Sequence, residues 1–317
     1  MGILRQLISP FRQTTGLARW ILLSGTILVA IFVIVAIFAP WIAPYGFSQV
    51  RETGDIFPKN SHPSAAHLLG TTEGHFDVLS RIIWGARTAL EVVIISVVIS
   101  VLAGAPLGLL SGFTGGWLDR VLVLIMDALY AFPSLLMAIV FSFLFSDLLG
   151  GGITAAAIAI TVIYIPQYFR VVRNTTVSAK EATYVEAARA IGAPNRTIMT
   201  KYLSSNVIQN VPVIGTLNAA DAISTLAALG FLGLGIQPTE AAEWGYDLQR
   251  ALAGASAGIW WTGVFPGLAI VLLITGLTLA GEGLNETVNP TLRKRKLLPF
   301  TLPAREADAE DRKAGEL

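Results

Sequence analysis

The stretch that decides how this chain is organised is residues 171–212, VVRNTTVSAKEATYVEAARAIGAPNRTIMTKYLSSNVIQNVP, a long polar segment between two apolar runs. Ser178 is followed three residues later by Glu181, which matches a capping box, where two side chains satisfy unpaired backbone donors at a helix start. Gly192 and Pro194 match a helix end. We therefore expect a short helix from Ser178 to Ile191 outside the bilayer.

One side of this predicted helix is small and apolar. Tyr184, Ala187, Ala188 and Ile191 recur at three- and four-residue steps, which places them on a common face, and charged residues surround it. A second amphipathic run follows at residues 195–202. Because small side chains let another surface approach closely, the segment is typical of a docking element.

The composition predicts an integral membrane protein of the all-α class. Hydrophobic residues make up 54% of the 317 residues, charged residues 14%, and the mean hydropathy is +0.65. A transmembrane helix needs roughly 20 apolar residues to cross a core of about 30 Å. Six runs meet this need, at residues 20–42, 88–110, 118–145, 153–172, 207–236 and 262–284.

These runs divide the chain into segments. The first run exceeds the apolar part of a cleavable signal peptide and ends in Pro40-Trp41, so we expect an uncleaved anchor. The predicted segments are an N-terminal segment (1–19), a first transmembrane helix (20–42), an outer loop (43–87), a five-helix core (88–284) with a cytoplasmic loop (173–206), and a C-terminal tail (285–317).

The basic residues predict the orientation. With the N-terminus in the cytoplasm, 17 of the 22 Lys and Arg residues fall in inner segments, as the positive-inside rule requires. This places both termini and the Ser178–Ile191 segment in the cytoplasm of a multi-pass protein of the cell membrane.

The sequence carries no motif for nucleotide or metal chemistry. It has no G-x-x-x-x-G-K-[ST] phosphate loop, no cysteine, and no Ser/His/Asp set. A net charge of +1 gives no indication of nucleic-acid binding. We expect no enzymatic activity and no bound cofactor, so that any ATP and Mg²⁺ would be held by a partner polypeptide.

Glu186, Ala187, Ala188 and, after three residues, Gly192 resemble the cytoplasmic signature of inner-membrane permease subunits of ATP-binding-cassette importers, in particular the peptide/nickel branch. Other landmarks follow the same family pattern in order: Pro44-Tyr45, Pro63-Ser64, His67, Gly70-Thr71, Asp77-Val78, Ser80-Arg81, Gly85-Ala86-Arg87, Gly115-Gly116, Asp119-Arg120, Phe231 to Gly235, Trp244-Gly245, Pro266-Gly267, Gly283-Leu284 and Asn289-Pro290. Departures occur at Thr72, His75, Phe76, Ser204-Ser205 and Leu226.

The resemblance implies a six-helix permease fold of the type I importer kind and a function in peptide uptake. The implied partners are a second, similar permease, two cytoplasmic ATPase subunits and an extracytoplasmic substrate-binding protein, in addition to membrane lipid. In this scheme the ATPase would bind Tyr184, Glu186, Ala187, Ala188 and Gly192, with Glu186 paired to an ATPase arginine.

Two acids lie inside predicted spans. Asp127 and Asp221 are costly in hydrocarbon, so we expect each to face a cavity or a partner and to be a candidate for the translocation path. Asn218, Ser224 and Thr225 either line the same side as Asp221 or bind backbone carbonyls. Membrane acids would also suit the alternative function, a stand-alone secondary transporter or channel.

The remaining polar and aromatic residues have plainer interpretations. His62, His67 and His75 share the outer loop but lack metal-ligand spacing, so we expect no metal site. Trp260 and Trp261 are typical of interfacial anchors. Arg293 to Lys296 fits the positive-inside rule as well as contact with anionic lipid, and the tail from Arg305 to Leu317 is expected to be disordered.

Overall fold

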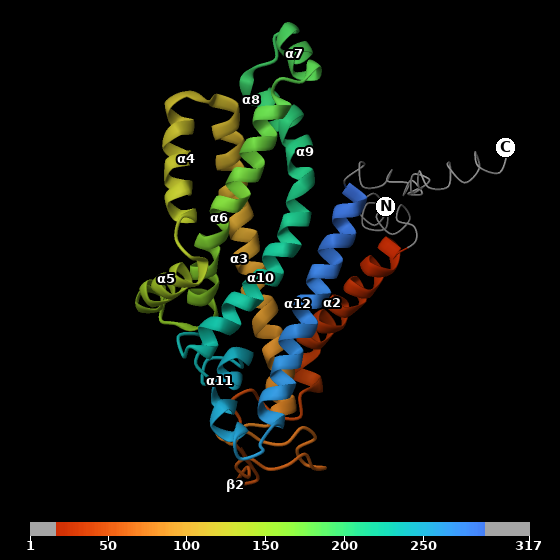
Figure 1. Cartoon of the computed structure of the whole chain (residues 1–317), viewed down its shortest axis with the longest axis vertical. Helices are drawn as coiled ribbons and strands as arrows, with labels where there is room; N and C mark the ends of the chain where they lie inside the picture. Colours follow the sequence, from red (N-terminus) through yellow and green to blue (C-terminus); the bar gives the residue numbers. More distant parts are fainter. Residues whose placement is uncertain (1–16, 289–317) are drawn as a thin grey trace, which may run out of the picture.

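The computed structural model describes residues 17–288, whose regular secondary structure is nearly all helical (Figure 1). The predictions for residues 1–16, for the basic cluster at Arg293 to Lys296 and for the C-terminal tail therefore lie outside the described residues. The long helices are α2 (Leu17–Ile42), α3 (Val78–Thr114), α6 (Gly152–Ala179), α10 (Val211–Phe231) and α12 (Trp261–Val288). Shorter ones are α4 (Gly116–Tyr130), α5 (Ser134–Leu149), α7 (Thr183–Ala190), α8 (Asn195–Thr197), α9 (Ser204–Val207) and α11 (Trp244–Ala255).

Five of the described helices are long and apolar enough to cross a membrane, namely α2, α3, α6, α10 and α12. The remaining predicted span, residues 118–145, which is the third along the chain, is not one continuous helix. It is the pair α4 and α5, bent by 96° at a short break that contains Pro133. Proline removes a backbone donor and disfavours helix in the residue before it, so the bend follows from the sequence Ala131-Phe132-Pro133.

The centre of the fold is the packing of α3 against α6. Gly104, Gly108 and Gly112 follow each other at four-residue steps along α3, and a Cβ atom on any of them would collide with the α6 backbone. On Gly104 it would lie 2.6 Å from the Ile165 carbonyl oxygen, and on Gly112 it would lie 2.7 Å from that of Arg173. The glycines thus let the two backbones touch, as small residues do in membrane helix pairs.

The elements gather at two opposite ends of the molecule (Figure 1). Helix α7 lies beyond one end of the bundle, and α2 begins and α12 finishes toward that same end. The opposite end carries α11 and a two-residue hairpin of β1 (Arg51–Glu52) with β2 (Asp55–Ile56). This arrangement agrees with an even number of crossings between Leu17 and Val288.

The outer loop is shorter than predicted, because α3 begins at Val78 instead of Thr88. Asp77 is its N-cap and accepts a hydrogen bond from the Ser80 amide at 2.8 Å. The sequence D-V-L-S therefore carries a capping signal that the apolar pattern alone did not reveal.

Candidate functional site

Helix α7 is the protruding element at one end of the molecule (Figure 1). It spans Thr183–Ala190, and Gly192 follows with φ of +78°, a left-handed conformation that glycine adopts without strain. The predicted helix end at Gly192 is confirmed. The exposed residues Tyr184, Ala187 and Ile191 form an apolar patch, and the Ile191 side chain is 80% exposed.

The predicted helix start at Ser178 is wrong. Ser178 belongs to the last turns of α6, which runs to Ala179, and its hydroxyl donates to the Asn174 carbonyl oxygen at 3.2 Å. Helix α7 begins only at Thr183 after a break, and its N-cap Ala182 provides no side-chain cap. The span of α6 thus extends about two turns beyond residue 172, which places α7 farther from the bundle centre than the sequence indicated.

Ala188 does not share the exposed face of Ala187. It is only 4% exposed and packs with Val185, Ile198 and Leu203 in a small cluster beneath α7. Neighbouring residues on a helix are about 100° apart, so two adjacent alanines cannot both face a partner. Glu186 is exposed, as a residue that binds another chain must be.

The predicted amphipathic run at residues 195–202 is not one regular helix. It comprises α8 and most of a π-helix at Ile198–Leu203. Helix α9 and a 3-10 turn at Ile208–Asn210 follow and lead into α10. Local π and 3-10 turns are frequent at functional hinges. The irregular geometry lies where Ser204-Ser205 departs from the family pattern.

Asp127 lies on α4 and is exposed, with its carboxylate paired to Arg170 of α6 at 2.7 Å. The Arg170 guanidinium also stacks over the Tyr130 ring, 4.1 Å from its centre. Pairing of the two charges offsets the free-energy cost of placing each of them in apolar surroundings. Its exposed position gives the bundle a polar surface on α4 and α6.

Asp221 of α10 lines a cavity of about 210 Å³, as predicted for a membrane acid that faces a cavity or partner. Tyr164 of α6 donates a hydrogen bond to its Oδ2 at 2.8 Å. The other walls are formed by α4, α5, α6 and the break between the first two. They comprise Leu129, Tyr130, Phe132, Ser134, Met137, Ile163 and Gln167.

Asn218, Ser224 and Thr225 do not line the cavity with Asp221. Asn218 and Thr225 are buried, whereas Ser224 is exposed and donates to the Ala220 carbonyl oxygen at 3.3 Å. The Asn218 side-chain nitrogen and the Tyr168 hydroxyl are buried without a hydrogen-bond partner among the described residues. Of the four residues predicted around this position, Asp221 alone lines the cavity.

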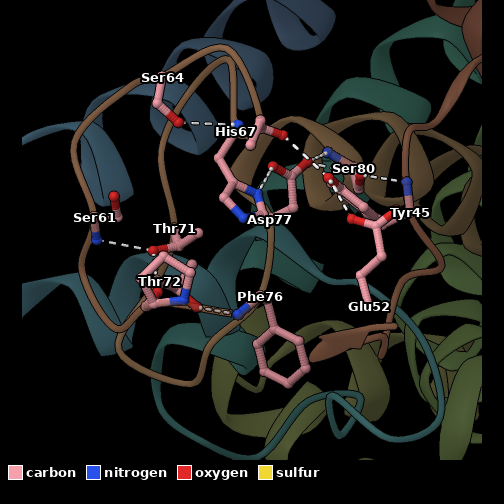
Figure 2. Close-up of polar contacts among 12 residues, drawn as sticks. Tyr45, Glu52, Ser61, Ser64, His67, Thr71, Thr72, Phe76, Asp77 and Ser80 are labelled. Carbon is pink, nitrogen blue, oxygen red and sulfur yellow. Dashed lines mark hydrogen bonds and ion pairs between the residues drawn. The ribbon is translucent and has the colours of Figure 1, made fainter. Parts of the chain in front are cut away.

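At the opposite end, the outer loop is fastened to α3 by a buried polar cluster (Figure 2). The His67 Nδ1 atom lies 3.0 Å from Asp77 Oδ1, and Asp77 Oδ2 accepts from the Ser80 hydroxyl at 2.7 Å. The Tyr45 amide donates to Ser80 Oγ at 3.0 Å. The residues of this loop that follow the family pattern, such as His67, Asp77 and Ser80, therefore fix the conformation of the loop.

The other two histidines have separate contacts. His62 packs against the Trp261 ring, and a ring nitrogen of His75 lies 2.7 Å from the Phe57 carbonyl oxygen. Within residues 17–288, no group of three or more His, Cys, Asp or Glu side chains is arranged to hold a metal ion. Trp261 is buried, whereas Trp260 is exposed, so only Trp260 has the exposure of an interfacial anchor.

Sequence reasoning missed two ion pairs that connect distant helices. Arg173 of α6 holds both oxygens of Asp119 at the start of α4, at 2.6 and 2.7 Å. Arg81 of α3 places its Nε 2.7 Å from a carboxylate oxygen of Asp247 in α11, and both side chains are buried. Asp119 and Arg81 belong to the family pattern in the sequence. Their partners lie 54 and 166 residues away, and no sequence spacing indicates that these residues meet.

The fold and these surfaces define a class: a multi-pass membrane protein with an apolar helical core, an acidic cavity among its helices and an element that projects from one end. Comparison with known families and proteins specifies it further. Residues 104–294 match the family "binding-protein-dependent transport system inner membrane component", and residues 20–63 match "N-terminal TM domain of oligopeptide transport permease C". The chain belongs to this family of binding-protein-dependent permeases.

Similar proteins cover nearly the whole chain. The glutathione transport system permease protein GsiD of Pectobacterium atrosepticum is 33% identical over 90% of this chain and 92% of its own length. The dipeptide transport system permease protein DppC of Alkalihalophilus pseudofirmus is 32% identical over 90% and 91%, respectively. The di/tripeptide transport system permease protein DppC of Pseudomonas aeruginosa is 37% identical over 86% and 88%.

Proposed function

We propose that this chain forms one half of the translocation pathway of an ATP-driven importer for di- or oligopeptides. The observation that carries the proposal is the exposed apolar patch of Tyr184, Ala187 and Ile191 on a helix that projects from the bundle. A cytoplasmic ATPase subunit would bind this patch, and Glu186 beside it would pair with a basic side chain of that subunit.

The connections of α7 suit the transfer of motion. Three residues join it to α6, and Val185 and Ala188 anchor its inner face on Ile198 and Leu203 of the segment that leads into α10. Leu109 and Phe113 of α3 pack against the same cluster. A displacement of α7 would therefore move α6 and α10, the two helices that carry Tyr164 and Asp221.

The distribution of charge supports α7 on the cytoplasmic side. Basic residues concentrate in the segments that the sequence predicts to face the cytoplasm, which include α7, as the positive-inside rule describes. The opposite end, with α11 and the ordered outer loop, would then receive the substrate-binding protein. The names of the relatives support peptides as the substrate class, and ATP and Mg²⁺ would be bound by the ATPase partners.

The proposal is tested by reconstituting the chain with a second permease, the ATPase subunits and the binding protein in liposomes. We expect dipeptide uptake that requires ATP. The Ala187→Trp variant should lose uptake while its thermal midpoint stays unchanged. An Ala187→Ser variant, which keeps a small side chain, should retain uptake. Normal uptake by Ala187→Trp would contradict the coupling role of this face.

The same preparation tests the alternative of a stand-alone secondary transporter, which the cavity acid Asp221 would suit. In that case the purified chain alone would take up solute when a proton gradient is applied, without ATP or any partner. We expect no uptake under these conditions.

A further inference from the structure

The cavity beside Asp221 has the chemistry of a cation site. Of the eight residues that line it, Asp221 alone carries a charge. Arg170 of α6 contacts the cavity wall through the Tyr130 ring, but its charge is paired with Asp127 at 2.7 Å. Within the described residues Asp221 has no ion-pair partner, and its single hydrogen bond comes from the neutral Tyr164 hydroxyl. One carboxylate oxygen is therefore left for a ligand.

The rest of the lining favours the same kind of ligand. Phe132 presents an aromatic ring, whose face attracts cations, and Ser134 and Gln167 add polar groups. The Tyr130 ring already carries the Arg170 guanidinium on one face. The volume of about 210 Å³ is below the ~300–1,000 Å³ of pockets that enclose a drug-sized molecule. The cavity therefore suits one end of a substrate.

We propose that Asp221 binds the protonated amino terminus of a peptide during its passage through the bundle. This inference rests on the proposed function and adds the chemical group that the pathway recognises. The α-ammonium group of a peptide has a pKa of about 7.7–8.0 and is mostly charged at pH 7. Asp221 would accept its hydrogen bonds while the Phe132 ring lies beside it.

The position of the cavity relates this site to the coupling element. Asp221 lies on α10 and Tyr164 on α6, the two helices joined through α7. The break between α4 and α5 supplies Phe132 to the wall, so that the bend itself shapes the site. A relative movement of α6 and α10 would displace Asp221 from the wall that Ile163 and Gln167 of α6 provide.

The test uses a reporter that needs neither the binding protein nor ATP. This chain has no cysteine, so Ser134→Cys, at an exposed cavity residue, gives it one thiol, whose maleimide labelling is followed on this chain in the assembled importer. We expect a dipeptide to slow labelling several-fold and its N-acetyl derivative to have no effect. When Asp221→Asn is combined with Ser134→Cys, the dipeptide should protect the thiol from labelling roughly tenfold or more weakly. This is the loss in affinity expected for one charge-assisted hydrogen bond.

Tyr164→Phe is the matched control, because it removes the hydrogen bond to Asp221 but leaves the carboxylate, and it should keep protection by the free dipeptide. Equal protection by the two peptides, or no change with Asp221→Asn, would overturn the inference. So would loss of the permease pair on native electrophoresis of Asp221→Asn, which would assign the carboxylate to a cation of the second permease.

Uptake separates this inference from the proposed function. ATP-dependent dipeptide uptake that Asp221→Asn does not reduce would leave the importer function intact and refute the amino-terminal site. Absence of ATP-dependent dipeptide uptake by the unaltered importer would refute the proposed function itself.

Discussion

Glu243, the residue before α11, is a buried carboxyl that caps this helix. Its oxygens accept hydrogen bonds from the Gly245 and Tyr246 amides at 2.7 and 2.6 Å. Burial raises the pKa of Glu243 from 4.5 to about 8, although both backbone hydrogen bonds act in the opposite direction. The folded protein therefore binds a proton at neutral pH that the unfolded chain releases.

The sign of the pH dependence follows from this difference in pKa. The folded state holds the extra proton between pH 4.5 and about 8, so the stabilisation is complete below pH 4.5 and is lost as pH rises through about 8. We expect the thermal midpoint to fall from pH 5.5 to pH 9, with a smaller fall in Glu243→Gln. Glu73 is the control, because its hydrogen bond to Lys59 lowers its pKa below 4.5, outside this pH range. Glu73→Gln should keep the original slope, whereas identical slopes in all three proteins would contradict this assignment.

The ion pair of Asp119 with Arg173 should stabilise the protein measurably. The guanidinium makes two hydrogen bonds to the carboxylate, and both side chains are largely buried. We expect a double-mutant cycle with alanine to give a coupling free energy of about 1–3 kcal/mol, from denaturation in mixed micelles.

Lys59 and Glu73 provide the comparison for this cycle. Their ammonium and carboxylate lie 2.9 Å apart, but both side chains are about half exposed. Such a surface pair should couple by less than about 1 kcal/mol. A larger coupling for the surface pair than for Asp119 with Arg173 would show that burial does not decide the strength of these pairs.

At the scale of elements, the contact of α3 with α6 depends on glycine. A methyl group on Gly108 would meet the Phe169 carbonyl oxygen, part of the rigid backbone of α6. We therefore expect Gly108→Ala to destabilise the protein by about 1–3 kcal/mol, seen as a lower thermal midpoint. Gly215→Ala in α10, where the nearest atom would be 3.7 Å away, should be neutral or slightly stabilising. Equal midpoints for both variants would contradict this account of the packing.

The elements also show how far the sequence can be read. Hydropathy and length predicted the apolar helices, because each must satisfy its own backbone groups in lipid. Gly192 was interpreted correctly because a left-handed residue after a helix is a local property. Ser178 was misread because a capping box is also compatible with a helix that continues, and the tertiary contacts of α6 decide that it does.

The site residues divide in the same way. Asp221 was found because a carboxylate inside an apolar run is unusual in itself. Ala188 was wrongly grouped with Ala187, since only the packing on Ile198 and Leu203 shows which side of α7 is covered. The pairs of Asp119 with Arg173 and Arg81 with Asp247 depend on contacts between distant helices, for which the sequence gives no spacing rule.

At the scale of the whole molecule, three regions to which the proposals assign a function follow one another along the bundle. The patch on α7 lies at one end, the cavity of Asp221 is formed among the helices, and the loop held by His67 and Asp77 lies at the other end (Figures 1 and 2). Helices α6 and α10 connect the first two regions. The central claim is therefore that α7 contacts a nucleotide-hydrolysing subunit in the cytoplasm.

Site-specific cross-linking tests this claim most directly, because the chain offers no native cysteine. Ile191→Cys places a thiol on the exposed patch of α7, and Asp55→Cys places one on the exposed hairpin at the opposite end. In membranes that contain the complete importer, the account predicts that Ile191→Cys cross-links to an ATPase subunit and that Asp55→Cys does not. Labelling of Ile191→Cys from outside intact cells by an impermeant maleimide, with no ATPase cross-link, would contradict it.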